Sequence, residues 1–397
     1  MKKLLVTLAL GASSFSAFAI TPLWLRDVNI SPDGKEIVFC YKGDIYKVKA
    51  AGGEAVRLTS QDSYESNPVW SPDGKQIAFA SDRFGNFDLF IMPAVGGTAK
   101  RLTMNSASEI PSTFTPDGKY VVFSASIQDP ASSALFPKSG MTELYKVPVA
   151  GGRTQQMLGT PAEMVCYAPS GDFFLYQDQK GVESEWRKHH TSSITRDVWM
   201  YDTKTGKHTN LTEVAGEDRN PVLSPDGKQV YFLSERNGGS FNVYRFPLDN
   251  PKEIQPVTSF KTNPVRFLSM GNDGTLCYTY DGEIYTQPVD GKPKKVAVSL
   301  VRDEEELPVS YSFTRGASEA VVSPDGKQVA FIVRGEVFVT SVEYGTTKQV
   351  THTPEAERGL SFGADNRSLV YSSERNGKRD LYIAKISRKE DLNFPNA

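Results

Sequence analysis

The adjacent pair His189 and His190 is the first candidate for chemistry in this 397-residue sequence. Two neighbouring side chains point to opposite faces of a strand, whereas in a loop two imidazoles could share a metal ion. No cysteine or carboxylate stands beside them at a useful ligand spacing. We therefore interpret this pair, like His208 and His352, as loop or packing histidines, and we expect no metal site.

Trp186 and Arg187 precede this pair and belong to residue types that are enriched at binding hot spots. They stand in residues 179–196, one of two long insertions in the sequence; the other is 127–141. Loops on a rigid scaffold commonly carry binding. Trp186, Arg187, His189 and His190 are therefore the candidate contacts to a peptide or protein partner. The alternative is that the loop folds over its own unit and Trp186 fills a neighbouring apolar gap.

Signatures of enzyme and cofactor sites do not occur in the sequence. After residue 19 there is no Gly-x-Ser-x-Gly, Walker loop, His-Glu-x-x-His or EF-hand loop. Cys40, Cys166 and Cys277 lie too far apart for a CxxC site, and we expect them to be buried free thiols. We assign no catalytic residue and no cofactor. A nucleophile and base brought together only by folding would leave no such signature.

The charge balance and the N-terminus restrict the class of protein. Forty-five Lys+Arg against 47 Asp+Glu, a net charge of −2, argue against a nucleic-acid binder. Lys2 and Lys3, the apolar residues 4–10 and the Ala-x-Ala site at 17–19 predict a signal peptide, residues 1–19, cleaved after Ala19. No later run is long and apolar enough to span a bilayer. We expect a periplasmic or secreted protein without membrane insertion.

A repeated turn motif organises the rest of the sequence. Ser31-Pro32-Asp33-Gly34-Lys35 recurs in exact or weaker form at positions 71, 115, 168, 224, 270, 323 and 363. Proline presets φ in this turn, aspartate bonds back to the backbone, and glycine accepts a positive φ. A period of 40 to 56 residues is that of propeller blades. Runs of β-forming residues around each turn predict four strands per copy, and helices should be rare.

The expected fold is therefore an all-β propeller, because stacked blades bury the apolar faces that one blade alone leaves exposed. Six copies occupy residues 20–303, and the acidic segment 303–308 interrupts the pattern. Two copies follow in residues 304–397, and the last shows no outer strand after residues 380–384. We expect a six-bladed ring plus the first two blades of a second propeller. The alternative is a single eight-bladed ring whose last blade borrows its outer strand from residues 21–25.

The repeats resemble the TolB-type, WD40-like propeller repeat, as in Asn-Pro-Val-Trp-Ser-Pro-Asp-Gly-Lys at 67–75. Two further stretches are similar to tricorn-type proteases. Residues 185–190 with 196–202 resemble the long insertion in the fourth blade of that family, and residues 315–324 with 332–339 resemble the start of its second propeller. The resemblance covers essentially all residues after the signal peptide.

This resemblance implies a relationship to large serine peptidases. In that family a six-bladed propeller precedes a seven-bladed one, a PDZ domain and catalytic domains, and the propellers are thought to admit peptides and release products. We expect this chain to be the peptide-binding or gating propeller portion of a tricorn-like periplasmic serine protease, its catalytic domains not in the chain, with a homo-oligomer possible through the parent protease. The alternative is a stand-alone TolB-like propeller that binds a protein partner in the cell envelope.

Overall fold

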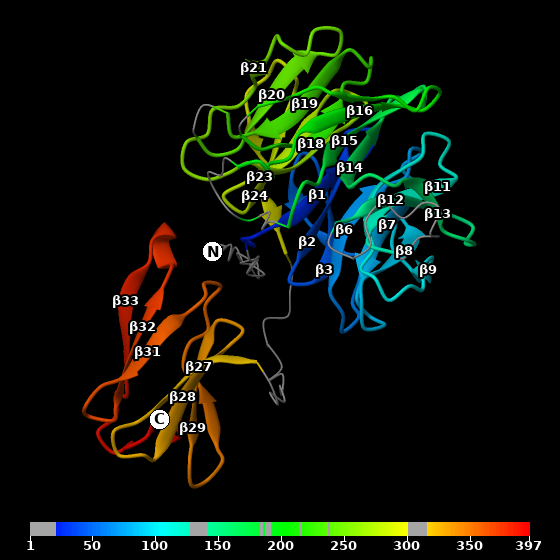
Figure 1. Ribbon diagram of the computed structural model, residues 1–397. Helices are drawn as coiled ribbons and strands as arrows, with labels where there is room; N and C mark the ends of the chain where they lie inside the picture. The colour runs from blue at the N-terminus through cyan, green and yellow to red at the C-terminus, as the bar shows by residue number, and fades with distance from the viewer. Residues whose placement is uncertain are drawn as a thin grey trace, which may run out of the picture. The chain divides into compact units, whose positions relative to one another are not determined.

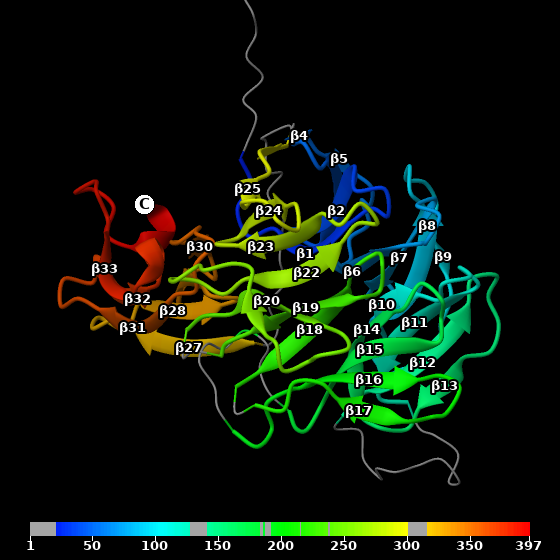
Figure 2. The same cartoon turned by 90° about the horizontal axis from the view of Figure 1, so that it is seen from above.

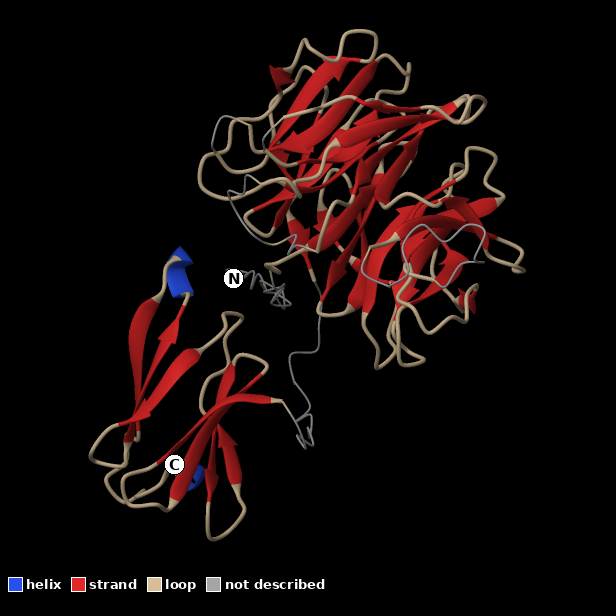
Figure 3. Cartoon of the chain, viewed as in Figure 1, coloured by secondary structure: helices blue, strands red, loops and turns tan. Residues whose placement is uncertain are grey.

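The computed structural model describes residues 21–127, 141–182, 186, 192–214, 216–236, 239–300 and 316–397. The chain divides into two compact units, Met1–Asp303 and Glu304–Ala397. Strands dominate both units, and the described helices are two short 3₁₀ turns, η1 (Arg375–Gly377) and η2 (Phe394–Asn396) (Figure 3). The predicted all-β, propeller-type fold is confirmed. The predicted signal peptide, most of the segment 127–141 and the whole break at 303–308 lie outside the described residues.

The first unit contains six four-stranded antiparallel sheets in its described residues, and each sheet is formed by one repeat of the chain (Figure 1). Sheet 1 joins β1 (Arg26–Ile30), β2 (Glu36–Tyr41), β3 (Asp44–Lys49) and β5 (Val56–Arg57); sheet 2 joins β6 (Glu65–Trp70), β7 (Gln76–Ser81), β8 (Asp88–Pro93) and β9 (Lys100–Arg101); sheet 3 joins β10 (Ile110–Phe114), β11 (Tyr120–Ala125), β12 (Glu143–Pro148) and β13 (Gln155–Leu158).

The next three sheets follow the same order, and Figure 2 shows β14 to β17 side by side. Sheet 4 joins β14 (Ala162–Tyr167), β15 (Phe173–Asp178), β16 (Val198–Asp202) and β17 (His208–Asn210); sheet 5 joins β18 (Asp218–Leu223), β19 (Gln229–Ser234), β20 (Asn242–Pro247) and β21 (Gln255–Pro256); sheet 6 joins β22 (Arg266–Met270), β23 (Leu276–Tyr280), β24 (Glu283–Gln287) and β25 (Lys294–Lys295).

The repeated motif forms the turn between the first and second strands, as predicted. In sheet 1 the Ser31 hydroxyl donates to Asp33 Oδ1 at 2.6 Å, and the Lys35 N–H donates to the same oxygen at 3.1 Å. Gly34 has φ +73°, a left-handed value that a side chain would disfavour. These local bonds satisfy the polar groups of the turn, so that each copy of the motif closes the same hairpin.

A second repeated device fixes the outer strand. A threonine hydroxyl after the fourth strand accepts an N–H at the start of the third strand, from its first or second residue, at 2.8 to 2.9 Å in five sheets. The pairs are Thr59 with Ile45, Thr103 with Leu89, Thr212 with Val198, Thr258 with Val243 and Thr351 with Val337. The Leu-Thr or Val-Thr of these five repeats therefore satisfies a strand-edge donor that would otherwise face solvent or a neighbouring sheet.

The first strands of the six sheets are in contact in chain order, β1 with β6, β6 with β10, β10 with β14, β14 with β18 and β18 with β22, and β22 also contacts β1. Two further contacts join sheets 6 and 1. The Asn272 N–H donates to the Pro32 carbonyl at 2.7 Å, and β26 (Val298–Ser299) pairs in parallel with β4 (Gly53–Glu54). Apolar side chains fill the spaces between neighbouring sheets, as in the cluster of Phe39, Val298 and Cys277.

The second unit holds one four-stranded and one three-stranded sheet among its described residues. Sheet 7 joins β27 (Ala317–Val322), β28 (Gln328–Val333), β29 (Glu336–Ser341) and β30 (Thr347–Gln349), and sheet 8 joins β31 (Arg358–Phe362), β32 (Ser368–Ser373) and β33 (Asp380–Lys385). Among the described residues no fourth strand pairs with β33. Residues 21–25 form no strand, and the Leu25 N–H donates to the Gly282 carbonyl of sheet 6.

Candidate functional site

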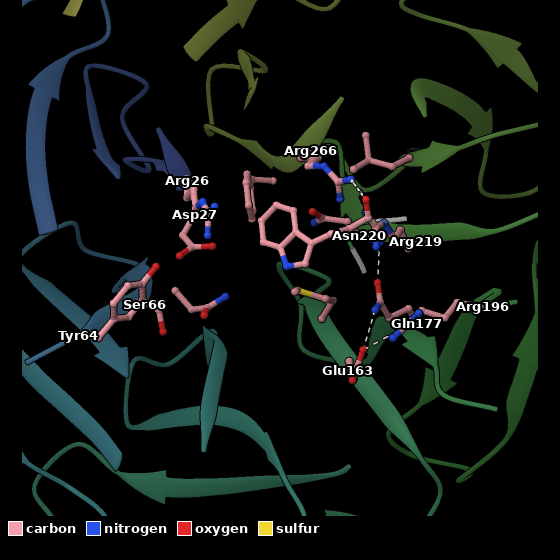
Figure 4. Close-up of a pocket in the computed structure, with 15 residues that line it drawn as sticks. Arg26, Asp27, Tyr64, Ser66, Glu163, Gln177, Arg196, Arg219, Asn220 and Arg266 are labelled. Carbon is pink, nitrogen blue, oxygen red and sulfur yellow. Dashed lines mark hydrogen bonds and ion pairs between the residues drawn. The ribbon is translucent and has the colours of Figure 1, made fainter. Parts of the chain in front are cut away.

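A cavity of about 230 Å³ lies at the starts of the first strands of sheets 1, 2, 4, 5 and 6. We call it the arginine cavity, because four arginines line it with two carboxylates; these charged residues are Arg26, Arg196, Arg219, Arg266, Asp27 and Glu163 (Figure 4). The lining formally carries two more positive than negative charges, and Glu217, which contacts Arg196 and Arg219 from outside this lining, reduces the excess to one. The cavity is therefore suited to an anionic or carbonyl-rich ligand.

A second cavity of about 290 Å³ is lined by the first strands of all six sheets and is called the inner-strand cavity. Five residues line both cavities and take the same place in their strands, next to a shift in strand register. They are Asp27, Asn67, Met164, Asn220 and Phe267, with φ between +50° and +56°. Such bulges re-aim side chains. Together these five residues form the boundary that the two cavities share.

The bulges carry local strain that neighbouring contacts support. A left-handed backbone costs about 1 kcal/mol or more for a residue such as Met164 or Phe267, whereas asparagine and aspartate tolerate it better. The Asn220 amide compensates by bonding the next strand: its nitrogen donates to the Leu268 carbonyl and its oxygen accepts the Leu268 N–H, both at 2.9 Å. Gln177 Oε1 in turn accepts the Asn220 N–H at 2.9 Å.

Buried ion pairs hold the arginines of sheets 4 and 5. Arg196 Nη1 lies 3.0 Å from Glu217 Oε1, and its Nε lies 3.4 Å from Glu163 Oε2. Glu217 also lies 3.7 Å from Arg219, and Gln177 Nε2 donates to Glu163 at 2.9 Å. These arginines are thus engaged with carboxylates, which fixes the wall of the cavity on that side.

Trp186 lies against the two remaining arginines. The guanidinium carbons of Arg26 and Arg266 lie 4.7 and 4.8 Å from the centre of its ring. Arg266 Nη2 also donates to the Trp186 carbonyl at 3.1 Å, and Phe267 meets the indole edge-on with the ring centres 6.0 Å apart. The indole remains 45% exposed. A side chain from the connection between β15 and β16 therefore contacts the first strands of sheets 1 and 6.

The structure describes one of the four contact residues that the sequence predicted. Trp186 lies in the arginine cavity, whereas Arg187, His189 and His190 lie outside the described residues. His208 Nδ1 lies 2.8 Å from the Tyr176 hydroxyl, and burial lowers the pKa of this imidazole. Across the described ranges, no three or more His, Cys, Asp or Glu side chains come together to hold a metal ion.

The sequence analysis identified neither the four arginines of the arginine cavity nor the five residues that line both cavities. Asp27, Asn67 and Asn220 each stand four residues before the serine of a turn motif, in strands that were judged only by their apolar residues. A polar residue recurring at this position of a half-buried strand was the available signal. Arg26 and Arg266 had no such signal, because their partner Trp186 lies far from both in the sequence.

Cys166 lines the inner-strand cavity, whereas Cys40 and Cys277 are buried, and all three cysteines are free. Burial raises the pKa of the Cys166 thiol to about 11. We predict that iodoacetamide modifies Cys166 first in the native protein, with a rate that still rises between pH 9 and 10, where an ordinary thiol of pKa about 8.5 levels off. Mass spectrometry of the modified peptides checks this. Faster modification of Cys277 than of Cys166 would contradict the placement.

The strand order, the repeated turn and the inner-strand cavities define a protein of the β-propeller class. Residues 22–292 match the family described as "Tricorn protease N-terminal beta propeller domain", and the chain belongs to that family. It is 22% identical to tricorn protease of Thermoplasma acidophilum over 372 residues, which covers 92% of this chain and 33% of that protein.

Solved structures agree on the fold. The tricorn protease crystal structure matches with a TM-score of 0.61 at 19% identity, covering 93% of this chain and 36% of that one. TolB from Acinetobacter baumannii matches with a TM-score of 0.50 at 19% identity, covering 69% of this chain and 64% of that one. The chain spans 31% to 62% of the length of the first curated relatives it matches. None of the helices in the described ranges has the length and hydropathy of a membrane-spanning segment.

Proposed function

We propose that the six sheets of the first unit form a closed six-bladed ring whose central channel comprises the two cavities. The contact of β22 with β1, the Asn272 to Pro32 hydrogen bond and the β26–β4 pairing support closure between sheets 6 and 1. The first strands of all six sheets line the inner-strand cavity, as expected for a channel along the axis of a ring.

In this proposal sheets 7 and 8, in residues 304–397, begin a second propeller. Three observations favour this over one eight-bladed ring. The contacts between sheets 6 and 1 leave no place between them for two further sheets, and Leu25 is hydrogen-bonded to sheet 6. The second unit also has its own apolar core, which includes Ile332, Val337 and Leu369.

The chain serves, in our proposal, as the peptide-binding propeller portion of a tricorn-like serine protease that residues 1–19 direct to the periplasm. The observation that carries the proposal is the pair of cation–π contacts that Trp186 makes with Arg26 and Arg266 at the arginine cavity. An indole face binds apolar and carbonyl groups of an extended peptide, while guanidinium groups bind its carbonyl and carboxylate oxygens. No catalytic residue of this chain is assigned to cleavage.

We predict that Trp186→Ala weakens the binding of a fluorescein-labelled acidic peptide about tenfold, since an aromatic contact and its cation–π partners contribute about 1–2 kcal/mol. Arg266→Met should weaken binding to a similar extent. A basic peptide of equal length should bind the wild type more weakly, because the cavity lining is positive in excess. Fluorescence anisotropy on the full chain measures all three, and added salt should weaken the acidic peptide more.

Phe84→Ala is the matched control. Phe84 is also an exposed aromatic with an arginine over its ring, Arg101 at 4.4 Å, but it does not line either cavity. This variant should bind the acidic peptide as the wild type does. Equal loss in Phe84→Ala and Trp186→Ala, or no loss in either, would exclude the arginine cavity as the peptide site.

A further inference from the structure

The charged groups of the arginine cavity are divided between its two sides (Figure 4). Three of the four arginines stand on the side of sheets 4 to 6: Arg196, Arg219 and Arg266. The acid on that side, Glu163, is paired with Arg196. On the side of sheets 1 and 2 the acid is Asp27, and the guanidinium of its neighbour Arg26 lies over the Trp186 ring. The cavity therefore offers cations to one end of a ligand and a carboxylate to the other.

The Asp27 side chain cannot join neighbouring sheets as its counterpart Asn220 does in sheet 5. Both residues stand next to a shift in register and have a positive φ. The Asn220 amide is used in two bonds to Leu268, the residue after the bulge of the next sheet. In sheet 2 the residue after the bulge is Pro68, which has no N–H, and an ionised carboxylate has no donor. Both bonds of this link are therefore impossible for Asp27, which lines the cavity instead.

Cys40 and Tyr64 surround the Asp27 carboxylate and leave it able to bind a ligand. The Cys40 thiol, which lines neither cavity, donates to this carboxylate, and burial followed by the Asp27 charge raises the pKa of the thiol. A thiol is a weak donor, and a carboxylate can accept about four hydrogen bonds. Burial also raises the pKa of the Tyr64 hydroxyl, and the Asp27 charge acts in the same direction. Figure 4 shows this hydroxyl and the carboxylate pointing toward one another.

Ser66 adds a hydroxyl to the same side of the cavity. The residue is 8% exposed and lines the cavity, and its hydroxyl makes no hydrogen bond to any residue that the structure describes. A buried hydroxyl without a partner is unfavourable, so a ligand that donates to it is stabilised. Asp27, Tyr64 and Ser66 thus present three oxygen acceptors and one negative charge. An ammonium group, with one positive charge and three N–H donors, matches this set.

We propose that this side of the arginine cavity is a subsite for the free α-amino group of a peptide, with Asp27 as its counter-ion and Ser66 and Tyr64 as further acceptors. The inference rests on the peptide site proposed above and names the class of peptide that this site takes. The amino terminus enters between sheets 1 and 2, while carbonyl and carboxylate oxygens face the arginines of the other side. Internal segments and N-terminally blocked peptides lack the charged group and bind less tightly.

The test compares two peptides that differ only in the amino group. One is Ala-Glu-Ala-Glu-Ala with a free amino terminus, and the other has a propionyl group in place of its first alanine. Isothermal titration calorimetry on the full chain at about pH 6.5 should show the free peptide binding about tenfold more tightly, the size of one charge-assisted hydrogen bond. This preference should shrink as the pH is raised through about 8, where an α-amino group loses its proton.

Three variants separate the amino group from the rest of the peptide. Asp27→Asn should bind the free peptide about tenfold more weakly but the propionyl peptide at least as tightly as the wild type does, because it removes only a negative charge. The fold accepts asparagine here, since sheets 2 and 5 carry it at the same position with a positive φ. Ser66→Ala should reduce the preference about threefold. Asp82→Asn is the control: Asp82 lines neither cavity, and its Oδ1 accepts the Tyr64 N–H at 2.7 Å, a bond that asparagine can keep.

The outcomes distinguish this inference from the peptide site on which it rests. Equal affinity of the two peptides for the wild type, with binding still lost in Trp186→Ala, would overturn the amino subsite and leave the peptide site in place. A preference that persists in Asp27→Asn would also overturn the subsite, because the amino group would then bind elsewhere. Binding of neither peptide, or binding that Trp186→Ala does not weaken, would overturn both.

Discussion

Asp218→Ala is expected to lower the free energy of unfolding of the first unit by about 3–5 kcal/mol, the usual cost of removing one partner of a buried ion pair. Asp218 is fully buried, and its Oδ2 lies 2.6 Å from Arg236 Nη2. The Arg236 guanidinium is also enclosed by the rings of Phe232 and Tyr244, at 5.0 and 5.5 Å. Without the carboxylate, this cation stays in an apolar environment with its charge unbalanced.

A similar pair of a buried carboxylate and an arginine occurs in other repeats. Glu65 with Arg83 in sheet 2 and Glu357 with Arg375 in sheet 8 lie 3.1 and 3.0 Å apart. Replacing both partners of the sheet 5 pair, Asp218→Leu with Arg236→Met, should restore most of the lost stability, because packed apolar residues often match or exceed a buried pair. Asp249→Ala, at an exposed position, should change stability by less than about 0.5 kcal/mol and is the surface control. A loss below about 1 kcal/mol in Asp218→Ala would show that the pair is solvated in solution.

Burial raises the pKa of Asp218 to about 6, which adds a pH dependence of known sign. An unfolded aspartate has a pKa near 3.9, so the folded protein binds more protons than the unfolded chain between about pH 4 and 6. The stability from this group is therefore full below about pH 4 and is lost as the pH rises through about 6. In urea denaturation, the free energy of unfolding of the wild type should therefore rise relative to that of Asp218→Asn as the pH is lowered from about 6 to about 4.

The elements that sequence alone predicted are those built from local contacts. The predicted turn at residues 31–35 is fixed by bonds within five residues, so its residues carry the whole signal and return with it in each strong copy. The threonine contacts, which were not predicted, span 14 or 15 residues inside one repeat.

The candidate site could be predicted only in part, because it is assembled from different repeats. Trp186 was a candidate by residue type, but its partners Arg26 and Arg266 stand 160 and 80 residues away in the sequence. Asn220 binds Leu268 across 48 residues. No spacing rule connects such pairs. The left-handed residues that line both cavities include Met164 and Phe267, residue types that give no sequence signal for a positive φ.

The account depends most on closure of the ring between sheets 6 and 1, since the channel exists only if these sheets meet. Glu54 in β4 and Ser299 in β26 are partners in a parallel pair. Neighbouring strands lie about 4.8 Å apart, within the usual range of Cα separations for a disulfide. Cysteines at both positions would link the ends of the six-sheet unit across more than two hundred residues.

The most direct measurement is therefore oxidation of the double variant Glu54→Cys with Ser299→Cys, with the two single variants as controls. We predict that the monomer forms an intramolecular 54–299 disulfide, identified by mass spectrometry of non-reduced peptides. Its reduction should then lower the free energy of unfolding by about 3–5 kcal/mol, as for a link that closes a long loop. Two thiols that remain free under oxidation, or that form disulfides only between molecules, would show that sheets 6 and 1 do not meet in solution and would contradict the closed ring.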